Sequence, residues 1–163
     1  MDIIAIKKSR TDKHDTLRFV RADGSSEETQ MPRQGILPHD LVHYVVESAL
    51  PLAHGFLSLV ARGAGAKFVM QEVHTPGNAA IEQQAAQTEA IVEALQAQLW
   101  AGYFDRQAFI EGAATACDAR DQPAYDFKDA DVEVLLYQPA IRLAETWAGV
   151  AYHDSMSLPF KAG

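Results

Sequence analysis

The sequence predicts a single α+β domain, in which a small antiparallel sheet of N-terminal strands and a C-terminal strand packs against four to five helices. Two observations carry this prediction. Short β-branched or alternating segments lie near the two ends of the chain, and apolar residues at helical spacing fill its middle. Because 163 residues are enough to bury one core, we expect a single domain over residues 1–163.

The N-terminal part of the chain predicts three strands. Residues 2–8 are rich in β-branched side chains, and residues 16–22 alternate apolar and basic ones. Asp23-Gly24 offers the positive φ of a tight hairpin turn, so a return strand over 25–31 should follow. The polar side chains of that return strand are typical of a solvated edge.

The C-terminal segment predicts one further strand. Met156, Leu158 and Phe160 alternate with smaller or polar residues, as a half-buried strand does. An isolated strand must pair its backbone groups, so we expect it beside the N-terminal hairpin. Pro159 has no N–H to donate, which favours an edge position.

The first predicted helix begins after Pro38, which the first helical turn accepts without a hydrogen bond. Pro51 should either kink this helix or start a second one. Residues 67–73 fit either a short strand or a helical turn, and we expect the strand. The apolar stripe comprises Leu41, Val42, Val45, Val46, Ala49, Leu52, Ala53, Phe56, Leu57 and Val60.

The strongest predicted helix spans about residues 78–102, with Asn78 as its N-cap. One side of it carries an apolar seam at spacings of four and three: Ile81, Ala85, Thr88, Val92, Leu95 and Leu99. Such a seam suits a packed helix pair, either within the fold or across a homodimer. The sequence leaves both arrangements open.

Two more helices are predicted in the C-terminal half. Asp105 can cap a shorter helix, and a last helix should run over about 131–148 with a kink at Pro139. Between them, residues 118–131 form an acidic loop that ends in a further N-cap.

Composition narrows the classes of partner. The net charge of −8 argues against nucleic-acid or anionic-membrane binding, both of which need basic surfaces. The single cysteine, Cys117, permits no intramolecular disulfide, and the N-terminal segment lacks the pattern of a signal peptide. We therefore expect a cytoplasmic protein. No residue pattern identifies a small-molecule substrate.

Chemistry is concentrated at the start of the first helix. His39, His43 and Glu47 lie four residues apart and so share one helix face. Neighbours at this spacing are close enough for two histidines to reach one divalent ion such as zinc. On an unbroken helix His54 would lie on the same face, as a third or fourth ligand, provided that Pro51 does not rotate it away. The alternatives are a functional pocket without a metal, which would include His39 and His43, and a purely structural role.

The pattern His39-Asp40-x-x-His43 resembles the His-Glu-x-x-His helix of zinc proteases, with Asp40 at the position of the general base. It departs from the metzincins, since Ala49 stands where their third histidine would be. It is also similar to the His-Asp-x-x-His helix of the zinc-motif protein of ubiquinone biosynthesis. The further ligand-type Glu of that protein corresponds to Gly55, beside His54.

A wider resemblance covers about the first 60 residues. The run from Leu17 to Ser25, then Leu37-x-His39-Asp40-Leu41-x-His43-Tyr44-x-x-Glu47 and Gly55-Phe56, resembles a family of small uncharacterised bacterial proteins. Trp147 before a closing strand fits that family as well. The resemblance implies the same hairpin-and-helix architecture and has no known activity to transfer.

Other candidate sites are weaker. The run 63–68 imitates only half of a dinucleotide fingerprint and follows a helix, where a strand would be needed. Cys117 has no base near it in sequence, which favours a buried hydrophobe. The segment Tyr152-His153-Asp154 is typical of a polar loop. His14 and His74 would be extra ligands only if the fold brings them to the stripe.

Two functions of different class follow. The first is a non-enzymatic module that forms a homodimer through helix 78–102, with the histidines helping to fix the first helix to the sheet. The alternative is a metal-binding protein, or a metal-dependent hydrolase or lyase, that uses His39, His43, Glu47 and His54 with Asp40 as the catalytic group. No organic cofactor is indicated.

Overall fold

The computed structural model describes residues 1–67 and 79–163. The elements in chain order are β1 (Asp2–Ile6), β2 (His14–Val20), β3 (Ser26–Pro32), α1 (His39–Ala49), α2 (Phe56–Ala61), α4 (Ala79–Ala101), α5 (Arg106–Asp118), the π-helical turn η1 (Glu133–Tyr137), α6 (Gln138–Gly149) and β4 (Ser155–Pro159). The predicted α+β class with an antiparallel sheet is confirmed. The strand predicted for residues 67–73 lies outside the described residues except for residue 67. Asn78, the predicted N-cap, and His74 also lie outside them.

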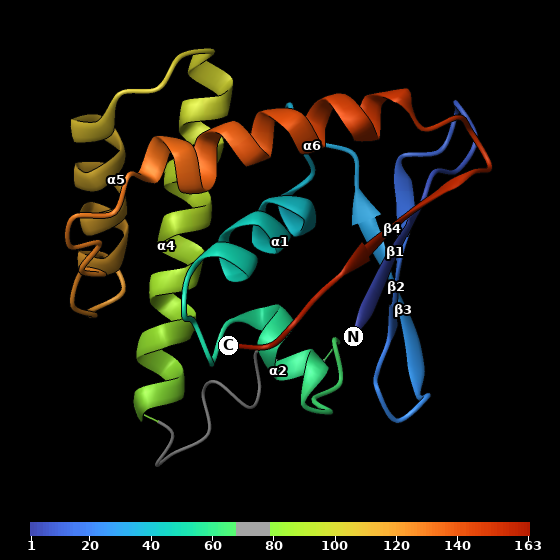
Figure 1. Cartoon of the computed structure of the whole chain (residues 1–163), viewed down its shortest axis with the longest axis horizontal. Helices are drawn as coiled ribbons and strands as arrows, with labels where there is room; N and C mark the ends of the chain where they lie inside the picture. Colours follow the sequence, from blue (N-terminus) through green and yellow to red (C-terminus); the bar gives the residue numbers. More distant parts are fainter. Residues whose placement is uncertain (68–78) are drawn as a thin grey trace.

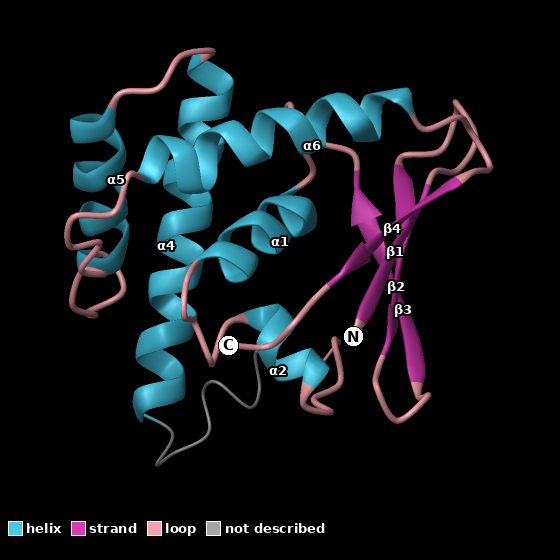
Figure 2. Ribbon diagram, in the orientation of Figure 1, coloured by secondary structure: helices cyan, strands magenta, loops and turns pink. Residues whose placement is uncertain are grey.

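The sheet has the strand order β3-β2-β1-β4, with every pair antiparallel (Figure 2). Ile3 of β1 lies opposite Phe19 of β2 on one side and Leu158 of β4 on the other. The C-terminal strand therefore pairs beside the N-terminal strands and forms an edge, as predicted from Pro159. Gly24 has a φ of 85° at the tip of the β2–β3 hairpin, in the left-handed region that the turn requires.

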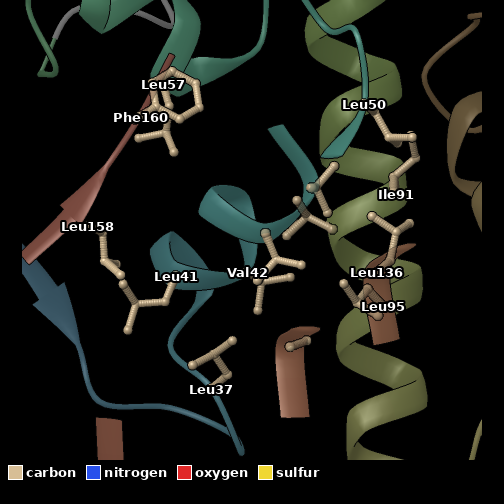
Figure 3. Packing of buried hydrophobic residues seen from close by; sticks show 14 of the residues in the cluster. Leu37, Leu41, Val42, Leu50, Leu57, Ile91, Leu95, Leu136, Leu158 and Phe160 are labelled. Carbon is tan, nitrogen blue, oxygen red and sulfur yellow. The ribbon is translucent and has the colours of Figure 1, made fainter. Parts of the chain in front are cut away.

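The helices are stacked outward from one face of the sheet. Figure 1 shows α1 between the sheet and α4, α5 on the far side of α4, and α6 crossing above α1 toward the strands. The core is continuous through these layers, and Figure 3 shows Leu41 and Val42 of α1 between Leu158 of β4 and Ile91 of α4. Among the described residues, no helix is long and apolar enough to cross a membrane.

At Pro51 the chain forms two separate helices and not one kinked helix. α1 ends at Ala49, and Leu50 adopts an extended conformation, which is the conformation that a following proline favours. A turn then leads to α2, which begins at Phe56. Pro51 thus removes His54 from the register of α1.

The last helix starts as a π-helical turn. Pro139 lies in the first turn of α6, immediately after η1, where the predicted kink was placed. A proline lacks an N–H and crowds the carbonyl one turn before it, so a widened turn at that point relieves the conflict. Asp131 caps this segment through the backbone N–H of Val134, and Asp105 caps α5 through that of Ala108.

The seam of α4 is largely covered by the same chain. Thr88, Val92, Leu95 and Leu99 are all buried, and Ile81 and Ala85 are partly buried. These side chains face the intramolecular neighbours of α4, chiefly α1 and α5. A homodimer through helix 78–102 remains a prediction, and it would have to use other side chains of this helix, such as the exposed Trp100.

Candidate metal centre

Helix α1 presents two different faces. Leu41, Val42, Val45 and Val46 are buried in the core. His39, His43 and Glu47, four residues apart, lie on the other face, which the chain covers with α4 and with the start of α2. The apolar face therefore anchors the helix, and the polar face is held against two other elements.

Helix α4 brings a carboxylate to this histidine pair. Glu89 Oε1 lies 3.0 Å from His43 Nε2, and Glu89 Oε2 lies 3.4 Å from His39 Nε2. The two Nε2 atoms are themselves 3.2 Å apart. Among the described residues, His39, His43 and Glu89 form a group whose ligand-type atoms all lie within 4.8 Å of one another.

Both imidazoles are oriented through their other nitrogen. His43 Nδ1 donates to Glu47 Oε2 at 3.0 Å, and His39 Nδ1 donates to Gln96 Oε1 on α4 at 3.2 Å. Because carboxylate and amide oxygens accept hydrogen bonds, each Nδ1 carries a proton. The lone pair of each neutral ring is then on Nε2, which faces Glu89.

The spacing of the three donors matches the needs of a tetrahedral ion. With metal–ligand bonds of about 2.0–2.1 Å, two ligands of a tetrahedral zinc ion lie about 3.3 Å apart. The two Nε2 atoms are 3.2 Å apart and each lies 3.0 to 3.4 Å from its own oxygen of Glu89, which is close to this value, and one ligand atom from each residue lies within 4.8 Å of the others. The site can therefore take a zinc-sized ion with small side-chain movements.

Without a metal, the group holds positive charge as protons. Burial opposes the charged form of His43, but hydrogen bonds to Glu47 and Glu89 raise its pKa to about 10. The hydrogen bond to Glu89 also raises the pKa of His39. Burial opposes the charge of Glu89, yet the hydrogen bonds from both rings hold the pKa of its carboxyl far below the ordinary value. A metal ion at this position would therefore have to displace a proton from the rings.

The structure brings together only some of the site residues predicted from the sequence. His39 and His43 come together as expected. Glu47 instead contacts His43 Nδ1, the ring nitrogen that does not face Glu89. His54 lies in the turn before α2, outside the group formed by His39, His43 and Glu89. Asp40 is half-buried beside the pair, and burial raises the pKa of its carboxyl while the charges of both histidines lower it.

Glu89 is the ligand-type residue that sequence reasoning missed. It lies one residue after Thr88 of the predicted seam, so it stands at the boundary of the buried face of α4. Gln96, seven residues later, is on the same side of the helix two turns away. The sequence showed a charged residue at the edge of the apolar seam of α4. Its place beside the two histidines follows only from the packing of α4 on α1.

The remaining candidates lie elsewhere. Cys117 is buried, and burial raises the pKa of its thiol, as for an inert apolar residue. The segment 152–154 forms an exposed turn before β4, and His14 is exposed at the start of β2. Gly63 and Ala64 follow the end of α2, so they do not form a strand-to-helix phosphate loop.

Comparison of the chain with models of protein families, with curated proteins and with solved structures gives no match. The interpretation of the site therefore depends on its own geometry and chemistry.

Proposed function

We propose that the protein binds one divalent transition-metal ion, of the zinc type, through His39 Nε2, His43 Nε2 and the carboxylate of Glu89. The observation that carries this proposal is the convergence of these three donors, from two helices, at the separations of tetrahedral ligands. Two imidazoles with a carboxylate suit zinc, whereas calcium and magnesium prefer sites made of oxygen alone.

The surroundings of the ligands support a metal more than a structural histidine pair. In metal sites the second nitrogen of a ligand histidine usually donates to a carboxylate or an amide oxygen, which fixes the tautomer. Glu47 and Gln96 are placed to do this for His43 and His39 respectively. A pair of histidines that merely filled space would not need both rings held in the same tautomer.

An ion has a route to the site from solvent. The side chains of His39 and Glu89 are 33% and 32% exposed, whereas that of His43 is only 3% exposed. The metal would thus be bound by the buried His43 and would reach it from solvent past the partly exposed side chains of His39 and Glu89. Exchange with metal ions in solution should therefore need no unfolding.

A metal-dependent hydrolase or lyase is the second candidate function. A set of two histidines and one glutamate is one of the ligand sets of catalytic zinc sites, in which water fills a further position. Asp40 is the half-buried carboxylate beside this set and would be the group to test. Zinc-loaded protein that hydrolyses an activated ester, with loss of that activity in Asp40→Asn, would support this candidate.

Metal binding itself is tested on protein purified without a histidine tag or chelating resin. We expect Co²⁺ to give the visible absorption of a tetrahedral complex at one ion per chain, and Zn²⁺ to displace it. His39→Ala and Glu89→Gln each remove a ligand and should lower affinity by more than the roughly 10–100-fold typical of outer-shell changes.

The matched control is His14→Ala, which removes an exposed histidine far along the chain from the site. It should bind Co²⁺ like the wild type. A wild-type protein that gives no tetrahedral spectrum, or a Glu89→Gln variant indistinguishable from His14→Ala, would refute the proposed function.

A further inference from the structure

We infer that Glu47 is a positioning residue of this metal centre, which ties the ligand His43 to the first turn of α2, and that Gly55 provides the space its carboxylate needs. This inference rests on the proposed metal binding. It assigns Glu47 a role outside the ligand set. It also implies that metal binding depends on the position of α2 relative to α1.

The carboxylate of Glu47 is saturated by three donors. Oε2 accepts from His43 Nδ1 at 3.0 Å and from the backbone N–H of Leu57 at 3.1 Å, and Oε1 accepts from that of Ser58 at 3.1 Å. Its side chain is fully buried. A buried carboxylate is tolerated only when donors satisfy it, so these three bonds fix its position. Neither oxygen is directed at the pair of Nε2 atoms.

The backbone at Gly55 passes directly over this carboxylate. A Cβ atom built on Gly55 would lie 2.2 Å from Glu47 Oε1 and 2.5 Å from its Cδ. The backbone of Gly55 has a φ of −70°, which any residue adopts, so the need for glycine here comes from the carboxylate and not from the chain conformation. The close approach allows the N–H groups of α2 to reach Glu47.

The start of α2 also touches the ligand ring itself. Phe56, the first residue of α2, packs edge-to-face on His43 with the ring centroids 5.8 Å apart. The turn before α2 is held to α4 by the backbone N–H of His54, which donates to Gln84 Oε1 at 3.0 Å. His43 is thus positioned on one side by Phe56 and through Nδ1 by Glu47, and both depend on where α2 is seated.

The inference predicts that displacing the Glu47 carboxylate weakens metal binding although no ligand is touched. Gly55→Ala pushes the carboxylate away from His43 Nδ1 and from α2. We expect a loss of about 10–100-fold in Co²⁺ and Zn²⁺ affinity, the range typical when an outer-shell partner of a ligand histidine is lost. Glu47→Gln keeps the shape but offers one acceptor oxygen for three donors, so it should also bind more weakly.

A spectroscopic signature separates this role from a merely structural one. In the Co²⁺-loaded wild type, each ligand imidazole should give one exchangeable, hyperfine-shifted N–H proton resonance, from His39 and from His43. Loss or fast exchange of the His43 signal alone is expected in Gly55→Ala and in Glu47→Gln, with the His39 signal kept by its bond to Gln96. A general loosening of the fold would affect both signals.

The control is Gly112→Ala in α5, where the added Cβ would meet only Ala94 Cβ at an ordinary 3.8 Å. This variant should keep the wild-type affinity and both signals. Wild-type affinity and both signals in Gly55→Ala and Glu47→Gln would overturn the inference while leaving the metal centre intact. A wild-type protein without a cobalt spectrum would instead overturn the metal centre, and this inference with it.

Discussion

Raising the pH from 7 to 9 should weaken the fold of the metal-free protein, because the unfolded chain loses the proton that folded His43 keeps. Burial opposes the charged ring, but Glu47 and Glu89 raise its pKa to about 10. An unfolded histidine has a pKa of about 6.5. The stabilisation is therefore fully present below pH about 6.5, declines above it, and is lost once the pH has passed the folded pKa.

The size of the effect follows from the same two values. A tenfold difference in proton affinity corresponds to about 1.4 kcal/mol, so a pKa raised to about 10 implies at most roughly 5 kcal/mol. Above pH 7 the free energy of unfolding should fall by up to about 1.4 kcal/mol per pH unit. Because Glu89 is partly exposed and solvent screens its charge, we expect roughly 2 kcal/mol between pH 7 and 9.

The assay is urea unfolding at pH 7, 8 and 9 in the presence of a chelator, followed by circular dichroism. Glu89→Gln removes one of the two carboxylates that hold the proton, so its stability should decline less steeply over this range. Burial also raises the pKa of Tyr44, which adds a decline at high pH, but that contribution is the same in both proteins and cancels in the difference. Equal slopes for wild type and Glu89→Gln would refute the reasoning.

Three further changes test the fold. Arg33→Ala leaves Asp15, which is 3% exposed, without its two-point ion pair and should lower the urea midpoint of unfolding; an unchanged midpoint would contradict a stabilising role of this pair. Val92→Glu with Leu95→Glu places two charges in the core, so circular dichroism should show loss of the fold; a variant that stays folded would contradict the burial of this seam. Gly112→Ala should raise the free energy of unfolding by about 0.4–1 kcal/mol, seen as a higher Tm; an unchanged or lower Tm would mean that the added methyl group does not fit beside Ala94.

The sequence predicted those features that depend on neighbouring residues. The β2–β3 hairpin follows from the alternation of side chains and from Gly24, and the cap of α5 follows from Asp105. The last strand was expected beside the N-terminal hairpin because its backbone groups need partners, and it joins the same sheet but pairs with β1. For the hairpin and the cap, a few adjacent residues contain the physical cause.

The candidate site could be predicted only in part, because its third donor comes from another helix. The spacing of His39 and His43 on α1 is visible in the sequence, whereas the contact with Glu89 depends on how α4 is rotated against α1. The spacing of Glu47 is the same as that of a ligand. Its different role arises because α2 presents N–H groups to it, and that contact depends on the turn after Pro51.

In the proposed metal centre, a proton and a metal ion would compete for one place. In the metal-free protein a proton on His43 Nε2 lies between that ring and Glu89, and a metal ion would occupy the same position and displace it. Metal affinity should therefore rise with pH across the range in which metal-free stability falls. With saturating Zn²⁺, the decline of stability between pH 7 and 9 should disappear or reverse. A decline that is unchanged by zinc would contradict a metal centre formed by His39, His43 and Glu89.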